Sequence, residues 1–412
     1  MDKNELKTLS IFSICLKVVV MSMNQNSKGP NPDVIIIGAG IIGLSIAYHI
    51  LELDPQCSIL VLEKEKLLGL GSTGTCTGGI RYQFTSPLLR QLSLQSRDFF
   101  LNFETVFDVP CWYRERGYLM LASQESRWND LKGTTEQANI EGIPVNLLSQ
   151  ADLEKNFPYL QRGHYLGGTL GKWDAYADPY AVLAALYAWV RRRGVAVNFE
   201  QEVTKIMTQG DSIQGVETTK GTIWSTRVVN ASGPFAAGLA ATAGIKIPVQ
   251  PFRRQVYVCT NPKDVPAAAP LIVDLATGFY LHQEASGKTI LLGGTDKDTR
   301  PGMKETVDKS LAEDFFLAAM EAIPSALNIK WLRTYTGIRE QTCDFHPILG
   351  EVPELKGFFA ASGLSGHGFM HAPAIGRILA DLILKGSSSE VNSELLFSKR
   401  FSRGSLSEAL VF

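Results

Sequence analysis

Three glycines near the N-terminus have the spacing of a turn that can hold phosphate groups. The segment GAGIIG places Gly38, Gly40 and Gly43 directly after the apolar run 33–37 and before the helix-like stretch 44–53. In such a turn the first glycine allows the tight bend, the second lets the backbone approach a pyrophosphate, and the third allows a helix to pack closely on a strand. The phosphates then lie at the start of the helix, where free N–H groups and the helix dipole favour negative charge.

A carboxylate follows at the distance that such a site requires. The run 58–64 predicts a second strand, and Glu63 lies at its end, 20 residues after the last of these glycines. An acidic side chain at this place can accept hydrogen bonds from ribose hydroxyls. Glycines, helix, strand and acid in register therefore predict a βαβ unit that binds a dinucleotide, with Ile41, Ile42 and Lys64 among the residues in contact with it.

The composition is that of an ordinary soluble globular protein, with 45% hydrophobic and 20% charged residues. A chain of 412 residues exceeds one typical domain core, so we expect two domains. Its 40 basic and 41 acidic residues argue against a nucleic-acid surface, which needs clustered positive charge. Six cysteines without a CxxC pair indicate reduced thiols in a cytoplasmic protein. His367 and His371 have helical spacing but lack the glutamate of HExxH and a third ligand, so we expect no metal site.

The N-terminal segment has the features of a tail. Its apolar run 11–21 is too short to span a bilayer, and no small-residue cleavage site follows. We interpret 1–30 as a loose tail, with translation starting at Met1, Met21 or Met23.

The remaining patterns predict both helices and strands. Helical patterns cover 87–107, 124–140, 178–193, 305–323 and 367–385, and strand patterns cover 117–122, 253–260, 278–283, 288–294 and 356–363. We expect an α/β protein in which a discontinuous, Rossmann-like FAD-binding domain with a parallel sheet is interrupted by an α+β substrate domain on a mainly antiparallel sheet. The expected segments are 31–112, 176–245 and 338–386 for the first domain, 113–175 and 246–337 for the second, and tails at 1–30 and 387–412.

Three further segments indicate which dinucleotide is bound: GLGSTGTCTGGIR at 69–81, VVNASGPFA at 228–236 and AASGLSGHGFMHAPAIG at 360–376. With the glycine turn, and in this order, they resemble the D-amino-acid-oxidase-type flavoprotein family, especially sarcosine oxidase beta subunits, glycine oxidases and the beta subunit of dye-linked proline dehydrogenases. The resemblance runs from about residue 33 to 386. It implies FAD as the cofactor. It also implies oxidation of the C–N bond of a small amino acid, or of an N-methyl or secondary amino acid, by hydride transfer to flavin N5.

The resemblance also implies cofactor contacts outside the glycine turn. Gly71 and Ser72 match positions that wrap the FAD phosphates and ribityl chain, and Val203 matches one that meets adenine. The helix that starts after Gly363 matches one that points at the flavin ring, where a helix N-terminus stabilises the negative charge of reduced flavin. The expected contacts therefore also include Ala231, Gly233, Leu364, Ser365, Gly366, His367, Gly368 and Met370.

Four side chains are candidates for the substrate end of the site. Arg339 in TGIREQ and Arg81 in GGIRYQF match arginines that related oxidases place at the substrate carboxylate, and we expect Arg339 just after a strand. A planar guanidinium suits that task because it bonds a carboxylate through two nitrogens. Tyr280 in GFYLHQ matches a strand that projects a tyrosine over the flavin, and His282, two residues on, would face the same side.

Three positions depart from the sarcosine oxidase pattern. Gly337 falls where monomeric sarcosine oxidases carry the cysteine bonded to flavin, so we expect non-covalent FAD. Leu291 falls near their oxygen-activating lysine, and Met370 falls on their substrate lysine. These differences argue against sarcosine as substrate and against oxygen as acceptor, and leave a partner subunit or a second flavin as a possible acceptor.

Two other functions stay open. The first is oxidation of a 2-hydroxy acid, as in some relatives, which would need a histidine base near flavin N5; His282 is the candidate. The second is a non-catalytic flavin-binding subunit or assembly factor. Reduction of the flavin by an amino acid without oxygen separates these alternatives from amino acid oxidation.

Overall fold

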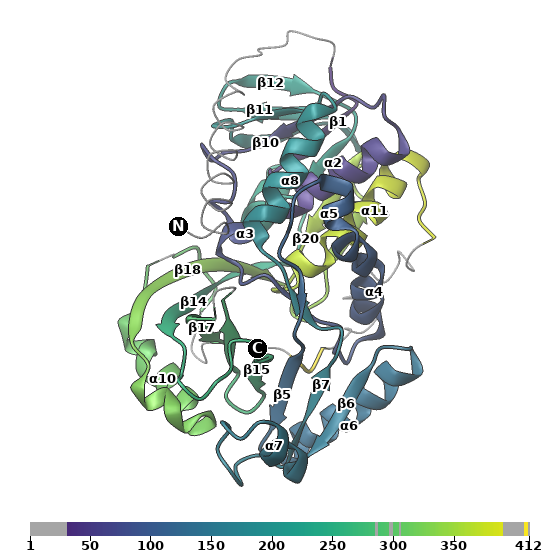
Figure 1. Cartoon of the computed structure of the whole chain (residues 1–412). Helices are drawn as coiled ribbons and strands as arrows, with labels where there is room; N and C mark the ends of the chain where they lie inside the picture. The colour runs from purple at the N-terminus through teal and green to yellow at the C-terminus, as the bar shows by residue number, and fades with distance from the viewer. Residues whose placement is uncertain (1–30, 285–286, 296–299, 305, 390–407, 411–412) are drawn as a thin grey trace.

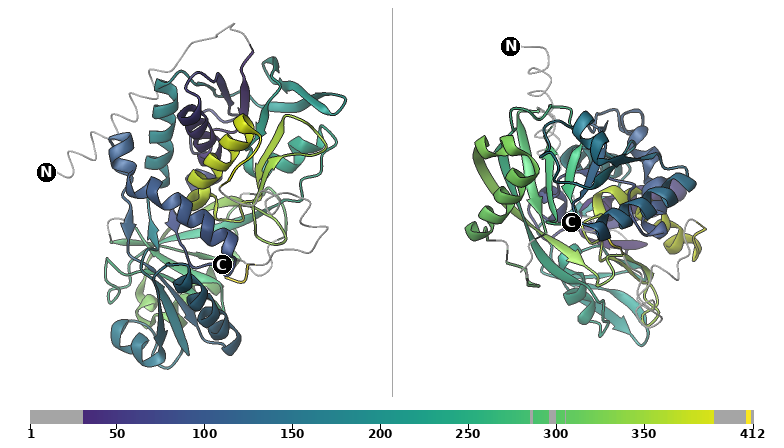
Figure 2. Two further views of the ribbon diagram at one scale, coloured as in Figure 1. Left: turned by 90° about the vertical axis from the view of Figure 1, so that its right-hand side faces the viewer. Right: turned by 90° about the horizontal axis from the view of Figure 1, so that it is seen from below.

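Two large β-sheets with helices packed against them form the molecule (Figure 1). The computed structural model describes residues 31–284, 287–295, 300–304, 306–389 and 408–410. The segments that contain β1 to α5, α8 to α9 and β19 to α11 build the upper part in Figure 1, and the segments between them build the lower part. Figure 2 shows the same two parts from the side and from below.

The first sheet has six strands in the order β19-β20-β13-β1-β2-β9. Strand β1 pairs in parallel with β2 and β13, and the edge strand β19 pairs antiparallel with β20. These strands are short, apolar and largely buried on both faces, as expected of a parallel sheet covered on both sides. Their bounds are β1 (Val34–Ile37), β2 (Ile59–Leu62), β9 (Ala196–Asn198), β13 (Val228–Asn230), β19 (Ile348–Glu351) and β20 (Phe358–Ser362).

Helices cover one face of this sheet and a small sheet covers the other. Val34 and Ile36 of β1 pack among the helices, whereas Ile35 and Ile37 pack against the small sheet and α9. The helices are α2 (Ile41–Leu53), α4 (Pro87–Leu101), α5 (Phe103–Phe107), α8 (Pro179–Arg192) and α11 (Gly368–Lys385). The other face carries β10 (Val203–Gln209), β11 (Ser212–Thr218), β12 (Gly221–Trp224), η1 (Gly233–Phe235) and α9 (Ala236–Ala241).

The second sheet has eight strands in the order β18-β14-β17-β16-β15-β5-β7-β6. Its neighbours pair antiparallel, apart from the parallel pair β5–β15. Its strands are β5 (Tyr118–Ala122), β6 (Val145–Ser149), β7 (Gly167–Gly171), β14 (Gln250–Thr260), β15 (Leu271–Asp274), β16 (Phe279–Gln283), β17 (Thr289–Gly294) and β18 (Trp331–Gln341). The remaining elements are α3 (Ser72–Thr75), β3 (Gly79–Ile80), β4 (Arg114–Glu115), α6 (Glu125–Ile140), α7 (Gln150–Asn156), β8 (Ala175–Tyr176), η2 (Lys309–Leu311), α10 (Ala312–Ala322) and η3 (Pro324–Asn328).

The two faces of this sheet have different neighbours. On one face, Leu119 and Leu281 share a core with Phe315 of α10 and Leu153 of α7. Residues on the other face, such as Val256 and Tyr280, line the cavity described below. Because neighbouring side chains on a strand alternate between faces, β14 and β16 each place residues both in the core and at the cavity.

Strand β18 joins the two parts of the molecule. It pairs with β14 along its length, from Trp331 opposite Cys259 to Gln341 opposite Gln250. Near its C-terminal end the carbonyl oxygen of Ile338 accepts a hydrogen bond of 2.6 Å from the Ser72 hydroxyl. The pairing with β14 therefore brings residues 337–340 to the segment that follows the first βαβ unit.

The expected fold class, a parallel sheet with helices beside a mainly antiparallel sheet, is confirmed. The division into domains stays a prediction, and one of its expected boundaries, between 337 and 338, falls inside β18. Two expected helices were wrong in their extent. The helix over 87–107 is two helices, because the Asn102 side chain donates to the Asp98 carbonyl and the chain turns there. The α-helix expected over 305–323 starts at Ala312, after the short turn η2, in which the Asp308 carboxylate accepts a hydrogen bond from the Ser310 N–H.

Within the described residues, no helix is long and apolar enough to cross a membrane. The same part of the chain contains no group of three or more His, Cys, Asp or Glu side chains placed to hold a metal ion. The tail expected at 1–30 lies outside the described residues.

Candidate functional site

The glycine turn between β1 and α2 has the geometry that its sequence predicts. Gly38 has φ +106°, and a Cβ there would lie 2.6 Å from the carbonyl oxygen of Ala231. A Cβ on Gly43 would lie 2.0 Å from the Gly38 carbonyl oxygen, so α2 packs against the turn with no room for a side chain. A Cβ on Gly40 would meet only the Thr73 hydroxyl, at 3.4 Å. Two of the glycines therefore serve packing, and Gly40 faces open space.

The start of α2 is suited to an anion. Gly40 is its N-cap residue and has no side chain to cap the helix. The Ile41 N–H donates to the Thr73 hydroxyl over 3.1 Å. A helix start leaves N–H groups that need partners, and its dipole favours negative charge. This end of α2 can therefore receive phosphate oxygens, with Thr73 beside them.

Glu63 is held in place directly after β2. Its carboxylate accepts hydrogen bonds from the backbone N–H groups of Ala39 and Glu65, each 2.9 Å long. Those two bonds orient the carboxylate at the edge of the glycine turn and leave lone pairs available. The arrangement can accept the hydroxyl hydrogens of a ribose bound along the turn.

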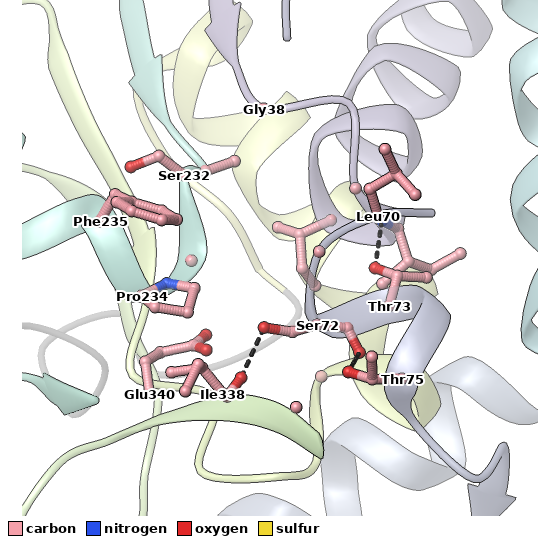
Figure 3. A pocket seen from close by; sticks show the side chains of 18 of the residues that line it. Gly38, Leu70, Ser72, Thr73, Thr75, Ser232, Pro234, Phe235, Ile338 and Glu340 are labelled. Atoms are coloured by element: carbon pink, nitrogen blue, oxygen red, sulfur yellow. Dashed lines mark hydrogen bonds between the residues drawn. The ribbon is translucent and has the colours of Figure 1, made fainter. Parts of the chain in front are cut away.

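The short helix α3 and the segment before it form a wall opposite residues 232–235 (Figure 3). The hydroxyls of Thr73, Thr75 and Ser72 lie on this wall, and Ser72 is tied to Ile338 of β18. A Cβ on Gly71 would meet no atom within 4 Å. Across the gap, Phe235 lies beneath the Lys64 ammonium, 3.7 Å from the ring centre. The gap between the two walls is thus lined by hydroxyls, backbone and one aromatic ring.

These walls enclose a cavity of about 540 Å³ that extends from Glu63 to the eight-stranded sheet. Most of the residues predicted for the cofactor line it: Gly38, Gly40, Ile41, Ile42, Glu63, Lys64, Gly71, Ser72, Val203, Ala231, Gly233, Leu364, Gly366 and Gly368. Five other predicted contacts do not line it: Gly43, Gly363, Ser365, His367 and Met370. Of the four residues predicted for the substrate end, Arg339 and Tyr280 line the cavity, whereas Arg81 and His282 do not.

The loop before α11 approaches the cavity closely because several of its residues have unusual backbone angles. Gly363, Ser365 and Gly366 have φ values of +73°, +52° and +88°. No side chain caps the start of α11, whose N-cap residue is His367. Met370 faces away from the cavity into the apolar core of the helices. The uncapped start of an 18-residue helix therefore borders the cavity, as it would if it faced the flavin ring.

Arg339 lies inside β18, which corrects the expectation that it follows a strand. The reason is the pairing of β18 with β14, which continues through Arg339 opposite Phe252 to Gln341. The Arg339 side chain is half-buried and its guanidinium packs on Gly366: a Cβ on that glycine would lie 2.7 Å from the guanidinium carbon. A glycine at this place in the loop lets the arginine lie flat against the start of α11.

Arg81 contacts His367, the N-cap residue of α11. Its Nη2 lies 3.2 Å from His367 Nε2 and donates to the Leu410 carbonyl over 2.8 Å, and its Nη1 donates to the Gln83 carbonyl over 2.7 Å. The side chain is 2% exposed. Burial lowers the pKa of Arg81 from its usual value, although the nearby carboxylates of Glu408 and Asp174 raise it. Two guanidinium groups thus contact neighbouring residues before α11, Arg339 at Gly366 and Arg81 at His367.

Tyr280 and His282 share a face of β16, as expected, but have different surroundings. The Tyr280 ring crosses to β17, where a Cβ on Gly293 would lie 2.5 Å from its hydroxyl oxygen. His282 is 4% exposed and packs edge-on against Tyr176, 5.0 Å between ring centres. Burial, followed by the charge of Arg116, lowers its pKa to about 4. His282 therefore stays neutral at physiological pH and lies away from the cavity.

Several cavity residues were not predicted. Thr73 and Thr75 belong to the segment 69–81, and hydroxyls at these positions are themselves a sequence signal for phosphate binding. Arg254 and Glu340 reach the cavity only because β14 pairs with β18, which no local pattern shows. Burial raises the pKa of Glu340 to about 7, although Arg339 and backbone N–H groups lower it. The TGIREQ motif therefore contains a carboxyl next to Arg339, but its burial and raised pKa follow only from the structure.

Together these features fit an extended dinucleotide. Gly40 and Gly71 give open approach along the backbone, the start of α2 offers N–H groups for a pyrophosphate, and Glu63 offers oxygens for a ribose. The start of α11 and the half-buried Arg339 lie at the other end, beside Tyr280. One end of the cavity thus suits a nucleotide, and the other a redox ring with a small anionic partner.

Comparison with known proteins gives a consistent result. The model of the family "FAD dependent oxidoreductase" matches residues 33–382. The chain is 28% identical to the Bos taurus "FAD-dependent oxidoreductase domain-containing protein 1", over 89% of this chain and 84% of the relative. Among solved structures, L-proline dehydrogenase from P. horikoshii superposes with a TM-score of 0.83 at 28% identity, covering 91% of this chain and 99% of that one. Glycine oxidase from Geobacillus kaustophilus superposes with a TM-score of 0.79 at 26% identity, covering 89% and 98%.

Proposed function

Because this chain belongs to the FAD-dependent oxidoreductase family, with FAD as its cofactor, we propose that it oxidises the C–N bond of a small amino acid or a secondary amino acid. The likeness to L-proline dehydrogenase and glycine oxidase supports a substrate of this class. One observation of the structure carries the proposal: the Arg339 guanidinium lies at the cavity, packed on Gly366 at the start of α11. A cation at that place can hold a carboxylate beside the redox ring.

The residues of this chain would then have separate tasks. Bound FAD supplies the two-electron redox chemistry. Arg339 would bind the substrate carboxylate and so orient the carbon that is oxidised. The charges of Arg339 and Arg81 favour the neutral form of the substrate amine, the form that can give up electrons. Tyr280, on the facing sheet, would close the site over the substrate.

Oxidation of a 2-hydroxy acid is less well supported. That reaction needs a base at the substrate hydroxyl, within hydrogen-bond reach. His282, the candidate for this task, is buried against Tyr176 and does not line the cavity. We therefore prefer an amine substrate, whose neutral form needs no base from the protein.

A substrate screen without oxygen tests the proposal. Glycine, sarcosine, L-proline, D-proline and D-alanine would each be mixed with the FAD-loaded protein, and loss of the flavin absorption band measured. At least one amino acid should bleach the flavin, and 2-hydroxy acids should not. A flavin that no amino acid reduces, while chemical reductants do, would instead favour a non-catalytic flavin-binding subunit.

Replacement of Arg339 tests the carboxylate contact. Removing one partner of a buried, hydrogen-bonded charge pair costs roughly 2–5 kcal/mol. Arg339→Leu should therefore lower kcat/KM for the amino acid by about 30- to 4000-fold, at about 1.4 kcal/mol for each factor of ten. An amine without a carboxylate should be almost unaffected. Arg333→Leu, on the exposed start of the same strand, is the matched control. If Arg339→Leu turns over amino acids at close to the wild-type rate, the carboxylate contact must be reassigned, first to Arg81.

A further inference from the structure

Glu340 places a buried carboxyl group in the wall of the FAD cavity. It follows Arg339 on β18, is 6% exposed and lines the cavity. Figure 3 shows its carboxyl group directed into the gap between η1 and the wall that carries Ser72. On the side of η1, a Cβ on Gly233 would lie 4.0 Å from Glu340 Oε2. An acid therefore belongs to the cavity wall, although neither the glycine turn nor the carboxylate contact at Arg339 requires one.

The backbone around Glu340 fixes the place of this carboxyl. Its carbonyl oxygen accepts a hydrogen bond of 2.9 Å from the Ser365 N–H, and Gln341 forms an isolated β-bridge with Leu364. These contacts tie the end of β18 to the loop before α11, and the Leu364 N–H stabilises the ionised form of the carboxyl. Strand end and loop therefore form one continuous part of the cavity wall.

Burial dominates the charge of Glu340. It raises the pKa of this carboxyl to about 7, although the backbone N–H groups of Glu340 and Leu364 and the charge of Arg339 lower it. The other ionisable side chains on the elements around Glu340 are Lys64 over Phe235, Arg253 and Arg254 of β14, Cys343, Asp344 and His346 after β18, and His367 before α11. The protein by itself thus leaves Glu340 only partly ionised near neutral pH, in spite of the adjacent arginine.

A bound FAD molecule would add to the effects that oppose ionisation. It displaces water from the cavity, and loss of water disfavours a charged carboxylate. It also carries two negative phosphate charges, and nearby negative charge raises the pKa of an acid. Both effects act in the same direction as the burial that already raises the pKa of Glu340.

We propose that Glu340 is a proton-binding residue of the FAD site: it is neutral when FAD is bound, and FAD binding takes up a proton from the solvent at this carboxyl. In its neutral form the group offers the cavity one hydroxyl donor and one carbonyl acceptor. Since the ionised form must gain a proton before FAD binds well, FAD affinity falls as the pH rises. The proton uptake does not depend on which substrate the protein oxidises.

Calorimetric titration of FAD into the FAD-free full chain measures the proton. The heat of binding is compared in two buffers with different heats of ionisation, and the difference gives the number of protons taken up. If FAD prefers the neutral form of Glu340 about tenfold, about half a proton is taken up at about pH 7.5, and FAD binds about tenfold more weakly at about pH 9 than at about pH 6. Release of protons, or no exchange of protons, would overturn the proposal, because an ionised Glu340 that accepts hydrogen bonds from FAD hydroxyls gives that result.

Two variants assign the proton to its residue. Glu340→Gln removes the ionisable group and keeps its shape, so it should bind FAD without proton uptake and with an affinity that hardly changes over the same pH range. Asp174→Asn is the matched control, because Asp174 is also buried and has a pKa raised to about 7, but does not line the cavity. This control should keep the wild-type uptake. Uptake that survives in Glu340→Gln, or that disappears in Asp174→Asn, would overturn the proposal. Where a variant does not fold, absence of uptake in the wild-type protein still refutes it.

The substrate screen gives an independent result. If amino acids reduce the flavin but FAD binding takes up no proton, the role of Glu340 is wrong and amino acid oxidation stands. If Glu340 takes up the proton but no amino acid reduces the flavin, the role of Glu340 stands and the substrate class is wrong.

Discussion

Replacing Gly40 by valine should weaken FAD binding strongly and leave the fold almost intact. Gly40 has φ −72° and ψ 179°, angles that valine adopts without strain. A Cβ there would meet only the Thr73 hydroxyl, at 3.4 Å. The protein therefore tolerates the side chain, and the valine methyl groups would fill the space that a pyrophosphate at the start of α2 needs.

The size of the effect follows from the added volume. Forcing extra methyl groups into a filled site costs about 1–3 kcal/mol, which lowers affinity about 5- to 150-fold. FAD at 100 times its Kd stabilises the wild-type protein by about 2.7 kcal/mol, because only the folded state binds it. If the Kd rises 100-fold, the same FAD concentration stabilises the variant by only about 0.4 kcal/mol.

Two other glycines give the comparison. Gly43→Ala would place a Cβ 2.0 Å from the Gly38 carbonyl oxygen, so that variant should lose stability even without FAD. Gly133→Val adds the same atoms as Gly40→Val on the exposed face of α6, where no atom lies within 4 Å of the Cβ, and should bind FAD normally. FAD titration by flavin fluorescence and denaturant unfolding with and without FAD measure both quantities. Two results would refute the assignment of open space at Gly40. The first is a Gly40→Val variant that binds FAD with wild-type affinity. The second is a Gly40→Val variant that, without FAD, is as unstable to denaturant as Gly43→Ala.

Three further outcomes are expected. Acid precipitation should release all the FAD into solution, since Gly337 lines the cavity where related enzymes carry a flavin-linked cysteine; flavin in the pellet would contradict this. Reduced enzyme should pass electrons to a dye faster than to oxygen, because Leu291 lies in an apolar cluster where related oxidases carry a lysine; rapid reoxidation by air in stopped-flow mixing would refute it. Burial raises the pKa of Asp174 to about 7, although hydrogen bonds from Gln83 and the Tyr82 N–H lower it. Between about pH 4 and pH 7 the Asp174 carboxyl is therefore protonated in the folded state and ionised in the unfolded state. Its contribution to the free energy of unfolding should therefore fall as pH rises from about 4 to about 7, and Asp174→Asn should flatten that slope in denaturant titrations; an unchanged slope would exclude Asp174 as its source.

The sequence by itself determined the first βαβ unit and the cofactor. Strand, glycine turn, helix, second strand and Glu63 are consecutive, so their geometry depends on local backbone angles and on packing between neighbours. The sequence predicted close backbone packing at Gly38 and Gly43, and in the structure neither position has room for a Cβ. Family resemblance over several ordered motifs then selected FAD and the fold class, and both are confirmed.

Only the tertiary structure decided which side chains meet at the substrate end. Arg339 lies within a strand because β18 continues its pairing with β14, and that pairing depends on residues far apart in the chain. The alternation of side chains along a strand correctly placed His282 and Tyr280 on one face of β16. It could not show that only Tyr280 lines the cavity. Arg81 and its Leu410 partner are 329 positions apart, so no local pattern could reveal their hydrogen bond. Motifs report the residues that a cofactor requires, whereas the partners of a buried charge depend on how distant segments pack.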